Sequence, residues 1–320
     1  MTELEVGGEM EFLQKRLFVD LAWYKKQTLN DIVNVGISRG SGYQTAVVNI
    51  AEIENTGVEF LLGGVPVKTP ALTWTTTFNI SNNKNTVIGL AEGQDKLTVG
   101  ESRNGRAFIE HVVGKPFAQV MAYDYMRDDA GNLILGATGL PQAASELTSQ
   151  GTGVHPVTGG WSNDVKFKNL TLSFLIDFKY GGVIYSGTNA IAYGNGLHKA
   201  TLEGRGDGIT VSGVDAEGNA MTSTVTDQNY YGALAGISKL QVYDADFIKF
   251  RSLSLTYNFP NLGNIKGLSI SLVGRNLFYI KKSTPNIDPE SNYTNGNAQG
   301  IEYLGLPTSR TYGINLGIKF

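Results

Sequence analysis

The sequence predicts an all-β chain that forms an antiparallel transmembrane β-barrel, on the basis of strand alternation, strand length and the sorting of connections. Between Leu170 and Tyr180, apolar side chains occupy the even positions and polar side chains most of the odd positions, with Leu175 as the exception. Because successive residues of a strand point to opposite faces, this segment has one apolar and one polar face. The same pattern recurs at Leu17–Trp23, Trp74–Ile80, Leu253–Phe259, Leu268–Leu272 and Tyr312–Phe320.

Alternation alone leaves two architectures open. A large soluble β-sandwich or propeller alternates in the same way as a membrane barrel. The segments are about 9 to 14 residues long, against a mode of about 5 to 6 in soluble domains, and this length favours strands that cross a bilayer at a tilt. The connections between the segments then favour the barrel.

Short and long connections alternate along the chain. Short turns are expected at Leu13–Arg16, Gly63–Pro70, Phe167–Asn169 and Pro260–Gly267. Long polar loops are expected at Leu29–Val48, Thr86–Lys115, Gly181–Asp244 and Lys281–Ser309. Outer-membrane barrels have short periplasmic turns and long extracellular loops, so a final strand that runs toward the periplasm puts both classes on the expected sides. The strand topology between Met126 and Trp161 stays open, with Asn132–Ala137 as the one candidate strand.

Composition agrees with a chain of strands and turns. Glycine supplies 40 of 320 residues, charged residues only 17%, and 15 Tyr and 14 Phe add β-favouring rings that suit membrane interfaces. The net charge is −3 and Lys and Arg form no stripe that could neutralise a run of phosphates, so no nucleic-acid partner is expected. The absence of Cys excludes disulfides and thiolate metal sites.

The sequence offers no support for enzyme chemistry. It contains no Gly-x-Ser-x-Gly elbow, zincin helix or phosphate loop, so we expect a protein without catalytic residues, cofactor or metal. Its three histidines, His111, His155 and His198, are expected to be exposed loop residues, because their spacing does not suit a metal site. Asp128 and Asp129 precede Ala-Gly-Asn, a turn-like sequence echoed at Asp215–Asn219, with a loop calcium site as the alternative.

A series of motifs runs in order along nearly the whole chain. It starts with Asn55-Thr56-Gly57-Val58-Glu59, inside Asn49–Glu59, and continues through Trp74–Asn85, Val113–Pro116, Val242–Tyr257, Gly274–Phe278, Asp288–Glu290 and Pro307–Phe320. In order and spacing these motifs resemble the SusC/RagA family of TonB-dependent transporters, whose strand signature is Asn-x-Gly-x-Glu. The alternating last strand with its terminal Phe320 is also similar to the C-terminal signal that the barrel assembly machinery reads.

The resemblance implies a barrel of roughly 22 strands around a plug. Residues 1–320 are then expected to form its C-terminal portion, with about ten or eleven strands and with no visible plug, TonB box or signal peptide. It implies an outer-membrane location and TonB-dependent uptake of an oligomeric nutrient, a glycan or a peptide, together with a SusD-like surface lipoprotein. Because an open half barrel leaves two unpaired edges, the chain alone is not expected to insert as a transporter.

Ligand contacts are expected from aromatic residues of the long loops, whose rings can stack on sugars or on peptide side chains. The candidates are Trp161, Tyr193, Tyr230, Tyr231, Tyr293 and Tyr303. An interface belt or loop packing explains such residues equally well. The inner faces of the strands carry Asp20, Asn79, Asp177, Lys179, Asn315 and Lys319, as a water-filled lumen requires. The alternative function is a soluble or surface-attached β-rich binding or adhesion module, which would need no detergent for solubility.

Overall fold

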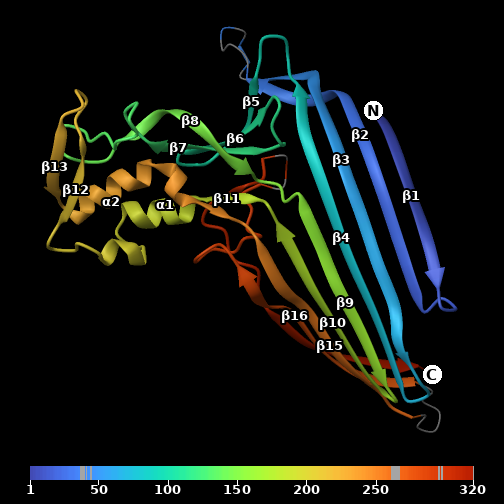
Figure 1. Ribbon diagram of the computed structural model, residues 1–320. Coiled ribbons are helices and arrows are strands. Elements are labelled where there is room, and N and C mark those ends of the chain that lie inside the picture. Colours follow the sequence, from blue (N-terminus) through green and yellow to red (C-terminus); the bar gives the residue numbers. More distant parts are fainter. Residues whose placement is uncertain are drawn as a thin grey trace.

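One antiparallel sheet of nine strands dominates the structure, a computed structural model that describes residues 1–320 except 37–39, 41, 44, 261–266, 295, 297 and 320. In this main sheet the strands lie in the order β1-β2-β3-β4-β9-β10-β15-β16-β18. Figure 1 shows them side by side as a long tilted wall with β1 at one edge. The strands are β1 (Thr2–Phe12), β2 (Leu17–Gly36), β3 (Thr45–Lys68), β4 (Leu72–Gly89), β9 (Val157–Phe167), β10 (Leu170–Tyr180), β15 (Phe247–Asn258), β16 (Gly267–Lys282) and β18 (Thr311–Lys319).

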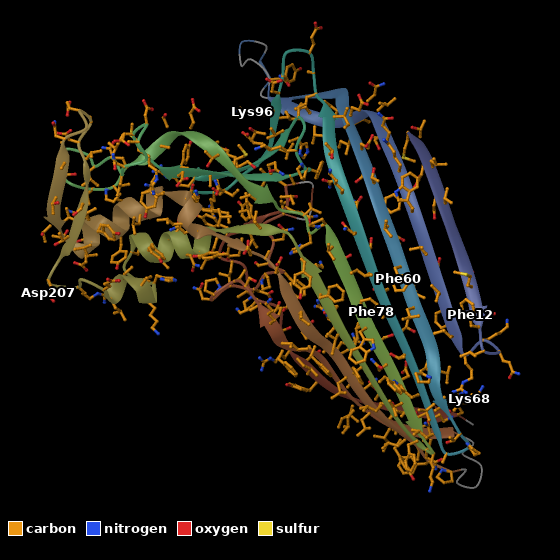
Figure 2. The ribbon with its side chains drawn as sticks, in the orientation of Figure 1. Phe12, Phe60, Lys68, Phe78, Lys96 and Asp207 are labelled. Atoms are coloured by element: carbon orange, nitrogen blue, oxygen red, sulfur yellow. The ribbon has the colours of Figure 1, made fainter. Side chains whose placement is uncertain are left out.

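The register of the main sheet aligns apolar residues of neighbouring strands into continuous rows on one side, called here the apolar face. One row joins Met10, Val19, Leu62, Phe78, Trp161, Ile176, Phe250 and Phe278. A second row joins Val67, Trp74, Val165, Leu172, Leu255, Leu272 and Ile314. Figure 2 shows Phe60 and Phe78 on neighbouring strands, part-way along the sheet. Exposed apolar area of this extent marks a surface that contacts lipid or another protein.

The opposite side of the main sheet, the polar face, carries the hydrophilic half of each alternating pattern. Asp20, Asn79 and Asp177 fall on a single row that also contains Glu9 and Lys249. The six polar residues expected on the inner side all lie on this face, because Lys179, Asn315 and Lys319 keep the same alternation in β10 and β18. The predicted division into an apolar and a polar side is confirmed.

Short and long connections are sorted to opposite ends of the main sheet. Residues 13–16, 69–71 and 168–169 are the short turns at one end. The other end carries the long connections 90–156, 181–246 and 283–310, which together form what we call the loop layer. The turn expected at Pro260–Gly267 lies mostly outside the described residues, and so does the terminal Phe320. In Figure 1 the long connections project from the upper end of the wall and the short turns lie at its lower end.

The loop layer has its own secondary structure and its own core. It contains a four-stranded sheet of β5 (Lys96–Glu101), β6 (Ala107–Val112), β7 (Gln119–Tyr125) and β8 (Ala143–Thr152), the hairpin β12 (Ile209–Val214) and β13 (Ala220–Val225), and the short strands β11 (Val183–Ser186), β14 (Val242–Asp244) and β17 (Ile301–Glu302). Helices α1 (Gly187–Gly194) and α2 (Asp227–Gly236) and the 3-10 turns η2 (Lys199–Leu202) and η3 (Ser238–Gln241) complete it. Ile109, Val120, Tyr185 and Ile301 are fully buried where these segments meet. None of the helices in the described ranges is long and apolar enough to cross a membrane.

Three expectations from the sequence are wrong. The segment Leu29–Val48 is not a long loop, since β2 continues to Gly36 and β3 begins at Thr45. Asn132–Ala137 is not a strand of the main sheet, because its backbone makes only isolated bridges at Leu133, Ile134 and Leu135. Instead β9 is the single crossing strand of the region left open, which keeps the alternation of turns and loops. The main sheet also has nine strands in the described residues, fewer than the expected number of about ten or eleven.

Candidate functional site

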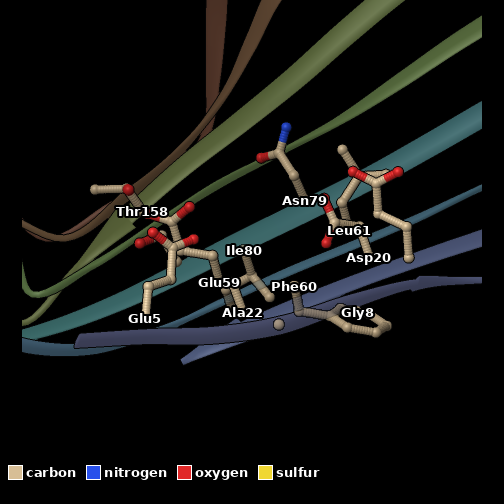
Figure 3. Close-up of a pocket in the computed structure, with 13 residues that line it drawn as sticks. Glu5, Gly8, Asp20, Ala22, Glu59, Phe60, Leu61, Asn79, Ile80 and Thr158 are labelled. Atoms are coloured by element: carbon tan, nitrogen blue, oxygen red, sulfur yellow. The ribbon is translucent and has the colours of Figure 1, made fainter. Parts of the chain in front are cut away.

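A groove of about 910 Å³ runs along the polar face of β1 to β4. Four carboxylates line it, from Glu5, Glu9, Asp20 and Glu59. In Figure 3 the carboxylates of Glu5 and Glu59 and the amide of Asn79 point to one side of the sheet, while the ring of Phe60 lies on the other. The groove therefore presents an acidic, water-accessible wall to whatever space the polar face encloses.

The Asn-x-Gly-x-Glu motif of β3 contributes its last residue, Glu59, to this groove. Asn55 accepts a hydrogen bond of 3.1 Å from the side-chain amide of Asn83 on the next strand. Gly57 lies beneath the ring of Tyr24, and a Cβ at this position would overlap that ring. Glu59 then follows on the same face, two residues further along β3. The motif thus combines a cross-strand amide contact, a seat for an aromatic ring and a carboxylate in the groove.

A second polar site lies at the loop end of β15 and β16, where a fully buried lysine holds the connection 283–310 to the main sheet. The side chain of Lys249 is 1% exposed. Its ammonium donates to Glu290 at 2.7 Å, to Thr308 at 3.0 Å and to the hydroxyl of Tyr279 at 3.1 Å. Burial of an ammonium is strongly unfavourable unless it is paired and hydrogen-bonded, and here all three donors have partners.

Arg251 extends this network to β10. Its guanidinium donates to both Asp177 and Glu290, with a further bond of 3.1 Å to Asn276. The register of β15 and β16 shifts between Phe250 and Ser252, and Asn276 has a φ of +52°. This irregularity lies within the Gly274–Phe278 motif, so the motif provides a β-bulge that turns Arg251 toward its two carboxylates.

The Asp-Pro-Glu motif supplies the loop side of the network. Asp288 accepts hydrogen bonds from the backbone N–H of Thr308 at 2.8 Å, from that of Glu290 at 3.0 Å, and from the hydroxyl of Tyr279. Burial raises the pKa of Asp288, but these hydrogen bonds outweigh it and lower the pKa to about 2. Burial likewise raises the pKa of Glu290, and the bonds from Arg251 and Lys249 lower it below its ordinary value. Both carboxylates are therefore ionised at neutral pH.

Three of the predicted ligand residues come together in the loop layer. Tyr193 of α1 lies 5.9 Å from Tyr231 of α2, and Tyr230 lies 5.3 Å from Tyr231, both measured between ring centroids. Tyr231 is 6% exposed and donates a hydrogen bond of 2.6 Å to the carbonyl of Ala200. Tyr231 therefore packs inside the loop layer, while Tyr193 and Tyr230 are partly accessible.

The other three candidates lie apart from this cluster. Tyr293 and Tyr303 form a separate pair, 6.0 Å between centroids, in the connection before β18. Trp161 is not a loop residue, as was expected, but a residue of β9 on the apolar face. Its indole N–H donates to the hydroxyl of Thr76 at 2.9 Å. A sugar or peptide contact by any of the six candidates stays a prediction.

The histidines match their predicted surroundings only in part, since His155 and His198 lie in connections of the loop layer. His111 is 1% exposed and lies in β6 with its ring 4.0 Å from that of Phe117, so the expectation of an exposed loop residue is wrong there. His155 and His198 are half-buried, and burial lowers the pKa of each. Within the ranges that the structure describes, no three His, Cys, Asp or Glu side chains are grouped so that they could hold a metal ion.

The turn assigned to the paired carboxylates is confirmed. Asp128 accepts a hydrogen bond of 2.7 Å from the backbone N–H of Asn132, and Asp215 accepts one of 2.8 Å from that of Asn219. The side-chain amides of Asn132 and Asn219 also donate to these carboxylates, and these bonds, together with the backbone ones, lower the pKa of both aspartates. The two sequences thus form the same Asp-capped turn.

Sequence reasoning missed the acidic residues of β1. Glu3, Glu5, Glu9 and Glu11 alternate with Leu4, Val6, Met10 and Phe12, and this strand pairs with β2 along its entire length. The period of two was present in the sequence, but Gly7 and Gly8 interrupt it and the acidic residues gave the segment a polar character. Counting the alternation on both sides of the glycines would have identified the strand.

Comparison with known proteins shows similarity in both sequence and fold. No family model matches the chain. It is 25% identical, over 99% of its length, to TonB-dependent receptor P3 of Formosa agariphila, and 23% identical over its full length to TonB-dependent receptor SusC of Bacteroides thetaiotaomicron. Its structure superposes on a chain of the RagAB peptide transporter with a TM-score of 0.73 and 19% identity over 99% of its residues. Over nearly its whole length the chain is therefore similar to TonB-dependent receptors that include SusC, and it shares the fold of part of the RagAB transporter chain.

The matched region is only part of each relative. The chain covers 34% of the P3 receptor, 32% of SusC and 34% of the RagAB chain. The chain is rich in antiparallel β-structure, and the proteins that it resembles are named as receptors and transporters. The order of motifs from Asn55 to Pro307 is thus accompanied by similarity in both sequence and fold.

Proposed function

We propose that this chain is the C-terminal part of an outer-membrane transporter that takes up an oligomeric nutrient, a glycan or a peptide, with energy delivered through TonB. The observation that carries the proposal is the construction of the main sheet. Its apolar rows span up to eight neighbouring strands, its other face is polar, and its short turns and long loops lie at opposite ends. A barrel wall between lipid and a water-filled lumen requires this combination.

The rest of the chain has roles that follow from this arrangement. The loop layer forms an extracellular surface on which a SusD-like lipoprotein closes, and the acidic groove of β1 to β4 faces the lumen. No covalent step is required, because the substrate is held by noncovalent contacts of loops and lumen and then released inward. The residues 1–320 act as a wall and a platform, and the remaining strands of a longer protein close the barrel and remove its two edges.

A pair of arginine substitutions in β10 tests the orientation of the wall in the full-length protein. Leu172 lies on the apolar face and Ser173 on the polar face, beside Asp164. We expect Leu172→Arg to destabilise the membrane-inserted barrel by about 2–4 kcal/mol if it lies near the bilayer centre, and Ser173→Arg to have little effect. The readouts are the amount of folded protein in the outer membrane and uptake of oligosaccharides or peptides by cells with and without TonB.

A lipid-soluble photoprobe provides a second readout that does not depend on substrate. It should label Leu172, Phe174 and Ile176 and leave Thr171 and Ser173 unlabelled. Labelling of the polar positions in preference to the apolar ones, or equal tolerance of both arginine variants, would overturn the proposal. Uptake that continues unchanged without TonB would remove its energetic part only.

A further inference from the structure

A groove interrupts the apolar face near the turn between β1 and β2. It has a volume of about 480 Å³ and is lined mainly by apolar side chains, with Leu13 and Leu17 on one side and Leu62, Phe78 and Trp161 on the other. A pocket of this size and lining suits an apolar ligand with a small number of polar contacts. It lies on the side of the sheet opposite the acidic groove and the Lys249 network.

The floor of this groove, called here the turn groove, is formed by a glycine. Gly64 pairs with Leu17 and Thr76 and belongs to the apolar face. A Cβ on Gly64 would lie 2.7 Å from the carbonyl oxygen of Arg16, so the close approach of two backbones excludes any side chain. The missing side chain leaves a depression beside Leu17 and Leu62 on this face.

The far wall of the turn groove is fixed by a polar contact. Trp161 is 39% exposed, its indole N–H donates to Thr76 at 2.9 Å, and its ring meets that of Phe174 edge-on at 5.8 Å. The indole is therefore held in one orientation with part of its ring free. An apolar chain in the groove would contact this exposed part.

The side chain of Arg16 places a positive charge at one end of the turn groove. The guanidinium of Arg16 donates to the carbonyl of Val65 through Nε and Nη2, at 3.1 and 2.9 Å, and to that of Pro66 through Nη2 at 2.8 Å. These bonds fix the position of the guanidinium and leave Nη1 unused among the hydrogen bonds of the described residues. Lys15, the neighbouring residue, is exposed and pairs only weakly with Glu11 at 3.3 Å. The end of the groove is thus positively charged.

We propose that the turn groove is a binding site for an anionic phospholipid, with an acyl chain along Leu62 and Trp161 and the headgroup phosphate on Arg16. The site rests on the proposed function, since it requires the apolar face to lie in a bilayer with the turn end at a headgroup layer. Apolar lining supplies affinity for the chain, and a fixed guanidinium is suited to bind a phosphate. The combination distinguishes this place from ordinary lipid-facing surface.

Native mass spectrometry of the full-length protein in detergent, titrated with phosphatidylglycerol, tests the site. We expect Arg16→Gln to weaken binding of one phosphatidylglycerol by about fivefold to tenfold, because one interfacial cation and a charge-assisted hydrogen bond are lost. Lys168→Gln is the matched control, since Lys168 is an exposed cation beside an aromatic ring, Phe167, at another short turn without such a groove. It should leave binding unchanged.

A second variant tests the chain-binding part of the site. Trp161→Ala should weaken phosphatidylglycerol and uncharged diacylglycerol alike, whereas Arg16→Gln should affect only the former. Equal binding by wild type and Arg16→Gln, or an equal loss in Lys168→Gln, overturns the lipid site while leaving the transporter proposal intact. Failure of the lipid-soluble photoprobe to label the apolar face at all would instead refute the transporter proposal. Thermal unfolding of each variant shows whether it has folded.

Discussion

Replacing Glu290 with Gln should release the connection 283–310 from the main sheet. Among the described residues, Glu290 is the one carboxylate that pairs with the buried ammonium of Lys249, and it also accepts from Arg251 at 2.7 Å. Loss of one partner of a buried ion pair costs about 3–5 kcal/mol because the other charge stays buried. Lys249 retains its bonds to Tyr279 and Thr308, so we expect the lower value of about 3 kcal/mol, or roughly a 100-fold larger opening constant.

Amide hydrogen exchange of the full-length protein measures this opening. The amides of Glu290, Ser291 and Thr308 all bond to Asp288, so their protection reports on the attachment of the loop. Protection should fall at these amides in Glu290→Gln and stay unchanged in the main sheet. Glu217→Gln, in an exposed turn, is the matched control.

A double variant separates buried charge from other effects. Adding Lys249→Met to Glu290→Gln removes the unpaired ammonium, so most of the lost protection should return. The reasoning would be refuted if Glu290→Gln left the three amides fully protected, or if the double variant were as weakly protected as the single one.

Three further outcomes are expected. Gly57→Val should block assembly of the barrel, because its side chain would occupy the position of the Tyr24 ring, and Tyr24→Ala should partly restore the yield of folded protein. The pKa of Asp288 is lowered to about 2, so its anchoring contribution is complete above the ordinary value of 3.8 and is lost as the pH falls toward 2. The protection of the Thr308 amide, measured relative to its intrinsic exchange rate at each pH, should fall over that range in the wild type but not in Asp288→Asn. Tyr231→Phe should lower the stability of the loop layer by about 1 kcal/mol, measured by limited proteolysis, because its hydrogen bond to Ala200 is lost.

The two faces of the main sheet could be predicted because one physical constraint acts on every residue of a crossing strand. In a barrel strand, lipid favours apolar side chains on one face and a lumen favours polar side chains on the other. The alternation in β10, β15 and β18 can therefore be recognised in each strand without knowing its partner strands. The same constraint marks the ends of such strands, and the short turns at residues 13–16 and 168–169 were located correctly.

The prediction from alternation fails where a strand no longer has one face toward lipid and one toward a lumen. Beyond the apolar band, β2 continues to Gly36 and β3 begins at Thr45, and the two strands stay paired through their backbones. Such a ladder does not need alternating side chains, so the sequence read Leu29–Val48 as a loop. The small sheet β5–β8 and the helices of the loop layer were not predicted for a related reason, since their burial depends on contacts between distant segments.

The network of Lys249, Arg251 and Glu290 also could not be predicted from local sequence. Asp-Pro-Glu was recognised as a motif, but nothing local indicates that Glu290 meets Lys249 and Arg251, roughly forty positions earlier, or that Asp177 of another strand joins them. The partners are determined by register and by the bulge at Asn276, which are properties of paired strands. The alternation in the sequence predicted that charged residues lie on the polar face, but it did not predict which of them form ion pairs.

The location of this network has a consequence for the transport function proposed above. Three register shifts, at Leu175/Ile176, Ile248/Lys249 and Phe250/Ser252, fall where β10, β15 and β16 meet the connection 283–310. Bulges bend strands and redirect side chains. At this place they direct side chains of the main sheet toward the connection 283–310. Because the loop is fixed through buried charges, Tyr293 and Tyr303 are carried on a segment anchored to the barrel wall. A ligand that contacts these rings would therefore meet a surface whose position the barrel determines, and Glu290→Gln should weaken such a contact without altering either tyrosine.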